Sequence, residues 1–356
     1  MSADRYQRQI QLAQIGSEGQ IRLGRARATL VGCGALGTVL AEQLVRAGVG
    51  HLRIIDRDIV EMSNLQRQVL FDEADAAQGT PKSVAAARRL KQINSAVYVE
   101  PVVADLHGEN IEELCGLEEG GGSRPDLLLD GTDNVQTRFL INDVAVKHGV
   151  PWIYGACVGT EGRMMAIRPG AAACLRCVFA EPPGAGELPT CDTAGVLGSA
   201  AGMVASLQST AAIKLLLGAE DSIGEQLFSV DLWSGRFRSI SLERAKRADC
   251  PACGLRRFEY LDAPAGDSAT LCGRDAVQIR PVNRGQRGHD APFDLKQAAE
   301  RLRKCGQIQQ TPYLLRCRLN SPEGVQLTLF PDGRLIVHGV ADVDRARSLY
   351  ARYVGS

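Results

Sequence analysis

The sequence predicts an α/β protein, a doubly wound parallel sheet with helices on both faces, followed by a small α+β domain. Two observations predict this class. Apolar runs of strand length alternate with helical segments from about residue 26, and a second, shorter series follows a change in composition at residue 261. The chain has 356 residues, of which 45% are hydrophobic, and this is enough to bury the cores of two domains.

Five apolar runs predict the strands of the sheet, and three segments with apolar residues at helical spacing predict the helices between them. Gly48 and Gly149 stand where two of these helices should stop, and residues 1–25 are expected to form a helical prelude. The predicted strands read "ATLVG", "LRIID", "VYVEPVV", "DLLLDGT" and "PWIYGAC", and the predicted helices read "LGTVLAEQLVRAG", "TPKSVAAARRLKQIN" and "VQTRFLINDVAVKHG".

After residue 160 the pattern becomes irregular. Residues 181–190, "EPPGAGELPT", are rich in proline and glycine and too polar to bury, so we expect a surface loop there. A long helix is predicted over residues 200–218. Because this helix is rich in alanine and apolar on most of its circumference, it lies either in the deep core or in a subunit contact.

The composition divides the chain into a main domain over residues 1–260, a linker over 261–270 and a small α+β domain over 271–356. The linker reads "LDAPAGDSAT". In the small domain we expect strands at 276–281 and 313–319, helices at 293–306 and 342–354, and a hairpin at 325–339 turned by Asp332-Gly333.

The first predicted strand runs into a glycine motif that opens a helix, as in Rossmann-like folds. Gly32, Gly34 and Gly37 have G-x-G-x-x-G spacing, which lets a phosphate approach the helix N-terminus. Asp56 ends the second strand, where a carboxylate would lie beside a ribose. NAD and ATP fit these residues equally well, and a glycine turn without any ligand is the third interpretation.

Polar and cationic side chains follow at the same sheet edge. Asn64, Arg67 and Gln68 come shortly after Asp56, and an NAD-dependent dehydrogenase has no need of an arginine there. Thr80 and Pro81 are expected to begin a helix and to leave Lys82 at its positive end. Phosphate binding would explain a lysine in that unfavourable place, and a solvated surface lysine is the alternative.

A carboxylate is predicted at the end of a central strand. Asp133, in "DGTDN", follows the strand "DLLLD" at the edge where open α/β sheets bind ligands. A carboxylate that faces a triphosphate needs a cation between them, and Mg²⁺ suits this set of ligands. Asp133 is alternatively the N-cap of the helix that begins near Val135.

Four cysteines form the strongest single pattern in the sequence. Cys174 and Cys177 form one C-x-x-C pair, and Cys250 and Cys253 form another. Two such pairs predict a tetrahedral Zn²⁺ site with four thiolates, in preference to redox pairs or free thiols. Because no coordination position stays open, this zinc should be structural.

The charge balance and the N-terminal sequence argue against a nucleic-acid-binding, membrane or secreted protein. Lys plus Arg equals Asp plus Glu, at 41 each, so no overall field attracts nucleic acid or a membrane. The N-terminal "MSADRYQRQIQ" has no signal-peptide core, and no apolar run is long enough to span a bilayer. We therefore expect a cytoplasmic protein, in which the 11 cysteines serve metal or thiol chemistry and not a disulfide framework.

Together these motifs resemble the ThiF/MoeB/HesA family, the bacterial relatives of ubiquitin-activating enzymes. The resemblance covers about seven-tenths of the chain, from residue 5 to residue 254. It depends on motifs in a fixed order, namely "RYQRQ", "GCGALG", "DRDIVEMSNLQRQ", "GTPK", "DGTDN", "CLRC", "TCDTAGVLGS" and "CPAC".

The resemblance implies an ATP-dependent adenylyltransferase. Such enzymes join the C-terminal Gly-Gly carboxylate of a ubiquitin-like sulfur-carrier protein to AMP and release pyrophosphate, in thiamine, molybdopterin or thiolated-tRNA synthesis. It also implies a homodimer in which Arg8 reaches the partner's active site. Implied nucleotide contacts are Gly32, Gly34, Asp56, Asn64, Arg67, Gln68, Lys82 and Asn134, with Asp133 holding Mg²⁺.

Cys191 lies where related enzymes that handle sulfur have a cysteine, so the resemblance implies sulfur transfer there, and an ordinary loop thiol is the alternative. Residues 271–356 show no rhodanese active-site loop and have no assigned role. Three other functions stay open: an NAD-dependent oxidoreductase, a family member that activates a tRNA-bound or peptide carboxylate, and a non-catalytic carrier-binding protein.

Overall fold

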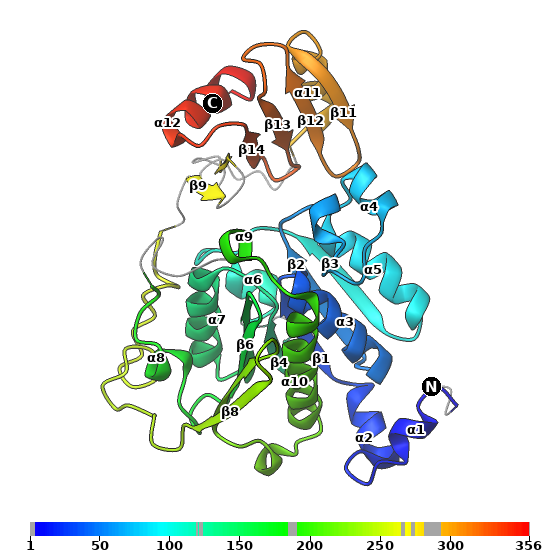
Figure 1. The fold of residues 1–356 in the computed structure, drawn as a ribbon, viewed down its shortest axis with the longest axis vertical. Coiled ribbons are helices and arrows are strands. Elements are labelled where there is room, and N and C mark those ends of the chain that lie inside the picture. Colours follow the sequence, from blue (N-terminus) through cyan, green and yellow to red (C-terminus); the bar gives the residue numbers. More distant parts are fainter. Residues whose placement is uncertain are drawn as a thin grey trace. The chain divides into compact units, whose positions relative to one another are not determined.

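The computed structural model separates the chain into two compact units, Met1–Pro264 and Ala265–Ser356 (Figure 1). It describes residues 4–118, 120, 124–183, 191–264, 268–271, 275–280 and 293–355, without the side chains of 191–192 and 268–271. Most of the loop expected over residues 181–190 lies outside this set, as does Cys272.

The first unit is built on an eight-stranded sheet with the order β3-β2-β1-β4-β5-β6-β7-β8. The strands from β3 to β5 are parallel, and β6, β7 and β8 extend the sheet in antiparallel fashion. The chain reverses its winding direction between β1 and β4, and this is where doubly wound sheets bind ligands. The strands are β1 (Arg27–Val31), β2 (His51–Asp56), β3 (Tyr98–Val103), β4 (Leu127–Asp130), β5 (Trp152–Val158), β6 (Glu161–Ile167), β7 (Gln226–Asp231) and β8 (Arg236–Ser241).

Helices cover both faces of this sheet, so the predicted fold class is confirmed. The apolar side chains of α3 (Ala35–Ala47), α5 (Lys82–Ile93) and α10 (Gly198–Leu216) pack in one cluster, and those of α6 (Ile111–Cys115) and α7 (Val135–His148) pack in another. Gly48 and Gly149 end α3 and α7 in the left-handed conformation, as predicted. The shorter helices of this unit are α1 (Gln7–Ile10), α2 (Gly16–Leu23), η1 (Met62–Asn64), α4 (Glu73–Gln78), α8 (Leu175–Val178), α9 (Cys191–Ala194) and η2 (Glu220–Ser222).

The long helix α10 lies beside α3 in the same unit (Figure 1). Ala200, Ala201, Val204 and Ala205 are fully buried within the single chain. α10 lies very close to the sheet: a Cβ on Gly162 of β6 would lie 2.2 Å from a methyl group of Val204. The small side chains of the helix allow this approach. One face of this helix therefore belongs to the core, and a subunit contact through its half-buried side chains, such as Met203 and Leu207, stays a prediction.

The irregular region expected after residue 160 in fact contains β6, β7 and β8. Sequence reasoning missed β8 because this edge strand is exposed along its whole length and has no apolar run. Its neighbour β7 buries only two of its six residues, Leu227 and Val230. The parallel prediction for the sheet therefore holds for its first five strands and fails for its last three.

The N-terminal prelude is fixed to the C-terminal end of α3. The side-chain amide of Asn94 donates to the Tyr6 hydroxyl and to the Val45 carbonyl, at 2.8 Å each. Gln20 donates to the Ala47 carbonyl at 3.0 Å. These bonds satisfy carbonyl groups that a helix end leaves unpaired, and they anchor the segment that carries Arg8.

The second unit contains a six-stranded antiparallel sheet with the order β11-β12-β13-β14-β10-β9. Its predicted helices and hairpin are confirmed, with Gly333 at φ 82° in the turn. Two strands were not predicted. β11 begins at Gly306, the last residue of the helix predicted over 293–306, and β9 begins at Ser268, within the expected linker. The elements are β9 (Ser268–Leu271), β10 (Ala276–Ile279), α11 (Leu295–Leu302), β11 (Gly306–Gln310), β12 (Leu315–Leu319), β13 (Gln326–Leu329), β14 (Leu335–His338) and α12 (Val343–Tyr353).

Across the described parts of both units, every helix is too short or too polar to cross a membrane.

Candidate nucleotide-binding and metal sites

The glycine loop connects β1 to α3 and needs its glycines for steric reasons. Gly32 has φ 88°, and a Cβ there would lie 2.8 Å from the carbonyl carbon of Gly131. A Cβ on Gly37 would lie 2.1 Å from the Gly32 carbonyl oxygen. Gly34 precedes the first residue of α3, so the loop lies at a helix N-terminus, where an anion is stabilised.

Asp56, at the end of β2, holds this loop. Its carboxylate accepts hydrogen bonds from the backbone N–H groups of Cys33, at 2.6 Å, and Asp58, at 2.7 Å. Burial raises the pKa of Asp56, and the nearby Lys82 charge opposes that effect. Its contact with a ribose stays a prediction, and the structure adds a second role, since Asp56 fixes the shape of the glycine loop.

Lys82 is buried at the start of α5. Its side chain is 6% exposed, and Nζ lies 3.0 Å from Oδ2 of Asp58. Burial alone lowers the pKa of Lys82, but the charges of Asp58 and Asp56 outweigh it and raise the pKa. The surface-lysine interpretation is therefore wrong. The N-cap is Pro81 and not Thr80, so Lys82 is the first helical residue.

Two buried amides face the same region with part of their hydrogen-bonding capacity unused. Asn64 is 1% exposed; its Oδ1 accepts from the Glu61 N–H at 3.1 Å, and its Nδ2 has no acceptor in the described structure. Gln68 is 4% exposed, and Nε2 would lie 3.9 Å from a Cβ on Gly34. Because a buried donor without a partner is costly, the free Nδ2 of Asn64 suits a ligand oxygen.

Arg67 lies between these amides in the chain. Its Nη1 donates to the Ser63 carbonyl at 2.9 Å, and no carboxylate of the described residues pairs with it. A Cβ on Gly198, the first residue of α10, would lie 3.6 Å from Cα of Arg67. The Arg67 guanidinium thus keeps donors for an anion.

The turn after β4 presents Asp133 without using its side chain as a helix cap. The N-cap of α7 is Asn134, whose Oδ1 accepts from the Thr137 N–H at 3.0 Å. The capping interpretation of Asp133 is therefore wrong. Asp133 is exposed and keeps its carboxylate for another ligand, whereas Asn134 already uses its side-chain oxygen within the chain.

Asp133 lies close to the cationic groups of the site. Burial alone lowers the pKa values of Lys82, Arg57 and Arg138. Nearby carboxylates, Asp133 among them, outweigh burial, so all three pKa values are raised. The structure therefore brings Asp133 and Lys82 into one electrostatic neighbourhood, although β4 and α5 are far apart in the sequence.

A buried ion pair that we did not predict supports the Asp133 turn. Arg138 Nε lies 3.0 Å from Oδ2 of Asp130, a carboxylate with no exposed surface. Asp130 also accepts from the Thr132 N–H and hydroxyl and from the Gly155 N–H, at 2.9, 2.8 and 3.3 Å. The only sequence signal was that an acidic residue ends an otherwise apolar strand. The pair fixes the backbone immediately before Asp133.

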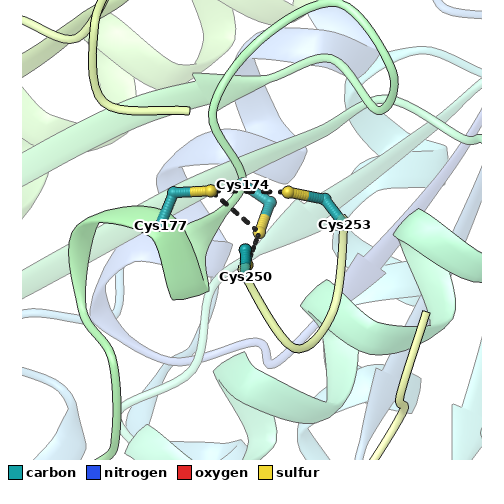
Figure 2. Close-up of side chains that lie close together, drawn as sticks. All are labelled: Cys174, Cys177, Cys250 and Cys253. Atoms are coloured by element: carbon teal, nitrogen blue, oxygen red, sulfur yellow. Dashed lines mark hydrogen bonds between the residues drawn. The ribbon is translucent and has the colours of Figure 1, made fainter. Parts of the chain in front are cut away.

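The four cysteines of the two C-x-x-C pairs come together, and their thiols point toward one another (Figure 2). All four sulfur atoms lie within 4.8 Å of one another. Cys174 Sγ lies 3.9 Å from Cys177 Sγ and 3.6 Å from Cys250 Sγ, and the Cys177–Cys253 sulfur distance is 3.4 Å. A tetrahedral zinc with Zn–S bonds of about 2.3 Å separates its sulfurs by about 3.8 Å, so these residues fit zinc.

The cluster also favours a thiolate. Cys174 donates to the sulfur of Cys177, and this lowers the pKa of Cys177 to about 4. Burial raises the pKa of Cys253 to about 12, so a bound cation is needed to make all four sulfurs anionic.

Arg8 lies in α1, is exposed, and donates to Gln11 Oε1 at 3.4 Å. Gln9 of the same helix donates to the Ala47 carbonyl at 2.9 Å, so α1 lies at the C-terminal end of α3 and the glycine loop lies at the other end. Cys191 begins the four-residue helix α9, and its side chain is outside the described part, so its role stays a prediction.

The fold and the site together define a nucleotide-binding α/β protein. Its doubly wound sheet has a glycine loop at the switch point, together with a buried lysine and an unpaired buried amide. The model of the ThiF family matches residues 6–252, and the chain belongs to this family. The predicted resemblance is therefore confirmed.

The curated relatives include the "Sulfur carrier protein ThiS adenylyltransferase" of Bacillus subtilis (strain 168), which is 42% identical over 353 residues and 99% of each chain. The "Sulfur carrier protein adenylyltransferase" of Thermus thermophilus is 39% identical over 70% of this chain and 90% of its own. A crystal structure of E. coli MccB with MccA-N7isoASN matches 71% of this chain and 75% of its own, with a TM-score of 0.61 and 20% identity. That last similarity concerns the fold alone.

We expect Arg138→Met to destabilise the main unit by about 3–5 kcal/mol, because it leaves the Asp130 carboxylate buried without its partner. Chemical denaturation measures the change. The double variant Asp130→Asn/Arg138→Met should recover part of the loss, and Arg46→Met, at an exposed arginine, should change stability by less than about 0.5 kcal/mol. Equal effects at Arg138 and Arg46 would contradict the assignment.

Cys177→Ser should lower the zinc content of the purified protein and destabilise the main unit, because structural zinc contributes directly to folding free energy. Elemental analysis and thermal unfolding measure the two effects. Cys305→Ser, in the other unit, is the matched control and should keep its zinc. Well-folded wild-type protein without any metal would rule out the site.

Proposed function

We propose that the protein uses ATP to adenylylate the C-terminal Gly-Gly carboxylate of a ubiquitin-like sulfur-carrier protein and releases pyrophosphate. The names of its relatives support this activity. The observation that carries the proposal is the group of Lys82, Asn64 and Asp133 around the glycine loop, in a chain that is 42% identical to one such adenylyltransferase over nearly its whole length.

The reaction forms one bond and breaks another at the α-phosphate. A carboxylate oxygen of the carrier attacks the α-phosphorus, and the bond from this phosphorus to the bridging oxygen of the β-phosphate breaks. The electron pair leaves with pyrophosphate. Because the attacking carboxylate is already ionised at neutral pH, no general base is needed. The site must position two anions and neutralise their charge.

The side chains divide this work. Lys82 is held by Asp58 at 3.0 Å and is ready to transfer its hydrogen bonds to phosphate oxygens. The free Nδ2 of Asn64 and the free donors of Arg67 add neutral and charged hydrogen bonds. Asp56 accepts the ribose hydroxyls in addition to the loop N–H groups. Gly32 and Gly34 let the phosphates approach the N-terminus of α3.

Two metals complete the proposal. The exposed carboxylate of Asp133 suits Mg²⁺, which binds one or two carboxylates together with substrate phosphates. Bound Mg²⁺ would supply positive charge to the leaving pyrophosphate. Zinc at Cys174, Cys177, Cys250 and Cys253 would be structural, because four thiolates leave no position for a substrate.

We also propose a cytoplasmic homodimer in which Arg8 completes the partner's site. In its own chain, the Arg8 segment is anchored at the C-terminal end of α3, where Gln9 donates to the Ala47 carbonyl at 2.9 Å. The glycine loop lies at the other end, and a helix of 13 residues is about 20 Å long. If Arg8 neutralises phosphate charge, it must do so in another copy of the chain.

Pyrophosphate exchange into ATP should occur only when a carrier ending in Gly-Gly is present, because the carrier carboxylate is the nucleophile. Radioactive pyrophosphate measures the exchange, and the same carrier without its last two residues is the control. Comparison of several carriers ranks the thiamine, molybdopterin and tRNA-thiolation pathways. No exchange with any carrier, together with tight NAD binding, would favour an oxidoreductase instead.

Arg8→Ala and Asp133→Asn should each be nearly inactive alone and should complement each other when mixed. A mixed dimer has one doubly damaged site and one intact site, which takes Asp133 from one chain and Arg8 from the other. With random pairing, about a quarter of wild-type activity should return. Activity that stays at the level of the single variants, while mass measurement confirms mixed dimers, would show that Arg8 does not act across the dimer.

A further inference from the structure

A cavity of about 380 Å³ lies at the edge of the main sheet opposite the glycine loop. Its upper rim consists of the first residues of three neighbouring strands, Arg27 of β1, His51 of β2 and Tyr98 of β3. These residues are directly paired across the sheet, so their side chains lie in one row on one face. Since β2 rises about 3.3 Å per residue, Asp56 lies about 16 Å away at the other end of the strand.

Two glycines, Gly24 and Gly50, line the cavity. A Cβ on Gly50 would lie 2.1 Å from the carbonyl oxygen of Gly24, so the two backbone segments are in direct contact there. The Gly50 N–H donates to the Leu23 carbonyl at 2.9 Å, which fixes this contact. Both glycines line the cavity together with Arg25 and Arg27, and neither places a side chain in it.

The charged side chains around the cavity give it a positive character. Arg27 Nη1 lies 3.1 Å from His51 Nδ1, so the arginine donates and the histidine accepts as a neutral ring. The other ring nitrogen, Nε2, then donates to Glu100 Oε2 at 3.1 Å. Burial lowers the pKa of His51, and the contact with Glu100 only partly opposes this effect.

The acidic groups nearby are already used. Arg53 contacts both carboxylate oxygens of Glu100, at 2.9 and 3.1 Å, and neutralises this carboxylate. Asp126 accepts from the Arg27 backbone N–H at 2.8 Å. Neither the Arg25 nor the Arg27 guanidinium forms an ion pair with a carboxylate among the described residues, so two cationic donor groups remain at the cavity.

The same cavity offers a flat aromatic surface. Tyr98 is 64% exposed, so its ring is accessible to a ligand. Its ring lies 5.0 Å from the His51 ring, with an angle of 54° between the planes. Two exposed guanidinium groups beside an exposed ring match a ligand that combines an anion with a planar group.

We propose that this cavity is a second ligand site, which binds a small phosphate monoester of an aromatic or heteroaromatic ring. The phosphate contacts Arg25 and Arg27, and the ring packs on Tyr98. The volume suits a ligand of this size, because small-molecule pockets begin at about 300 Å³. The site is separate from the adenylylation site and does not depend on that activity.

Phenyl phosphate is the simplest probe of this site, since it contains one phosphate and one ring. Calorimetry on the full-length protein should show saturable binding with a Kd of about 1 mM. Inorganic phosphate and phenol, which each contain one half of the probe, should bind at least about tenfold more weakly.

Arg27→Gln and Tyr98→Ser should each weaken phenyl phosphate binding by about tenfold, because each removes one half of the contact. Both side chains are exposed, so both variants should fold, and thermal unfolding checks this. Arg46→Gln, at an exposed arginine on the same unit, and Arg67→Gln, in the nucleotide site, should bind phenyl phosphate as the wild type does.

No saturable binding to the wild type below about 10 mM would overturn the proposal. Binding that is lost in Arg67→Gln and kept in Arg27→Gln would also overturn it, because the probe would then be in the nucleotide site. Pyrophosphate exchange by Arg27→Gln should equal that of the wild type. The two proposals therefore fail separately, since binding can persist in a protein that shows no exchange.

Discussion

The candidate site depends on one backbone contact, between the glycine loop and the turn that follows β4. A Cβ on Gly32 would lie 2.8 Å from Gly131, and a Cβ on Gly131 would lie 2.4 Å from the Gly32 carbonyl oxygen. No side chain larger than hydrogen fits at either position. This contact brings the N-terminus of α3 and the turn that presents Asp133 to the same point of the sheet, at the reversal of winding between β1 and β4.

Around this contact, the charged groups are held in pairs before any ligand arrives. Asp58 holds Lys82 and Arg138 holds Asp130, at 3.0 Å in both cases. The first pair lies at the start of α5 beside the Asp56 carboxylate, whereas the second is fully internal and fixes the turn. If ATP binds as proposed, its phosphates meet a lysine that is already positioned, so little reorganisation is needed at that side chain.

Local patterns allowed the sequence to predict the doubly wound order, the glycine loop, the burial of α10 and the four-cysteine cluster. The partners of buried charges could not be predicted, because the pairing of Asp58 with Lys82 depends on how β2 and α5 meet in space. The edge strand β8 was missed because both of its faces are exposed and it lacks the apolar pattern of a buried strand. Asp133 was correctly placed at a strand end, but only the structure shows that Asn134 caps α7.

The cysteine cluster has a consequence for the chain's topology. Cys177 and Cys250 are 73 residues apart, and the segment between them contains α10, β7 and β8. A metal bound by both C-x-x-C pairs turns this segment into a closed ring. For a covalent cross-link, a ring of this size removes about 4 kcal/mol of chain entropy from the unfolded state. The two edge strands β7 and β8, which bury few apolar side chains, would thus be held by a constraint on the unfolded chain as well as by their own contacts.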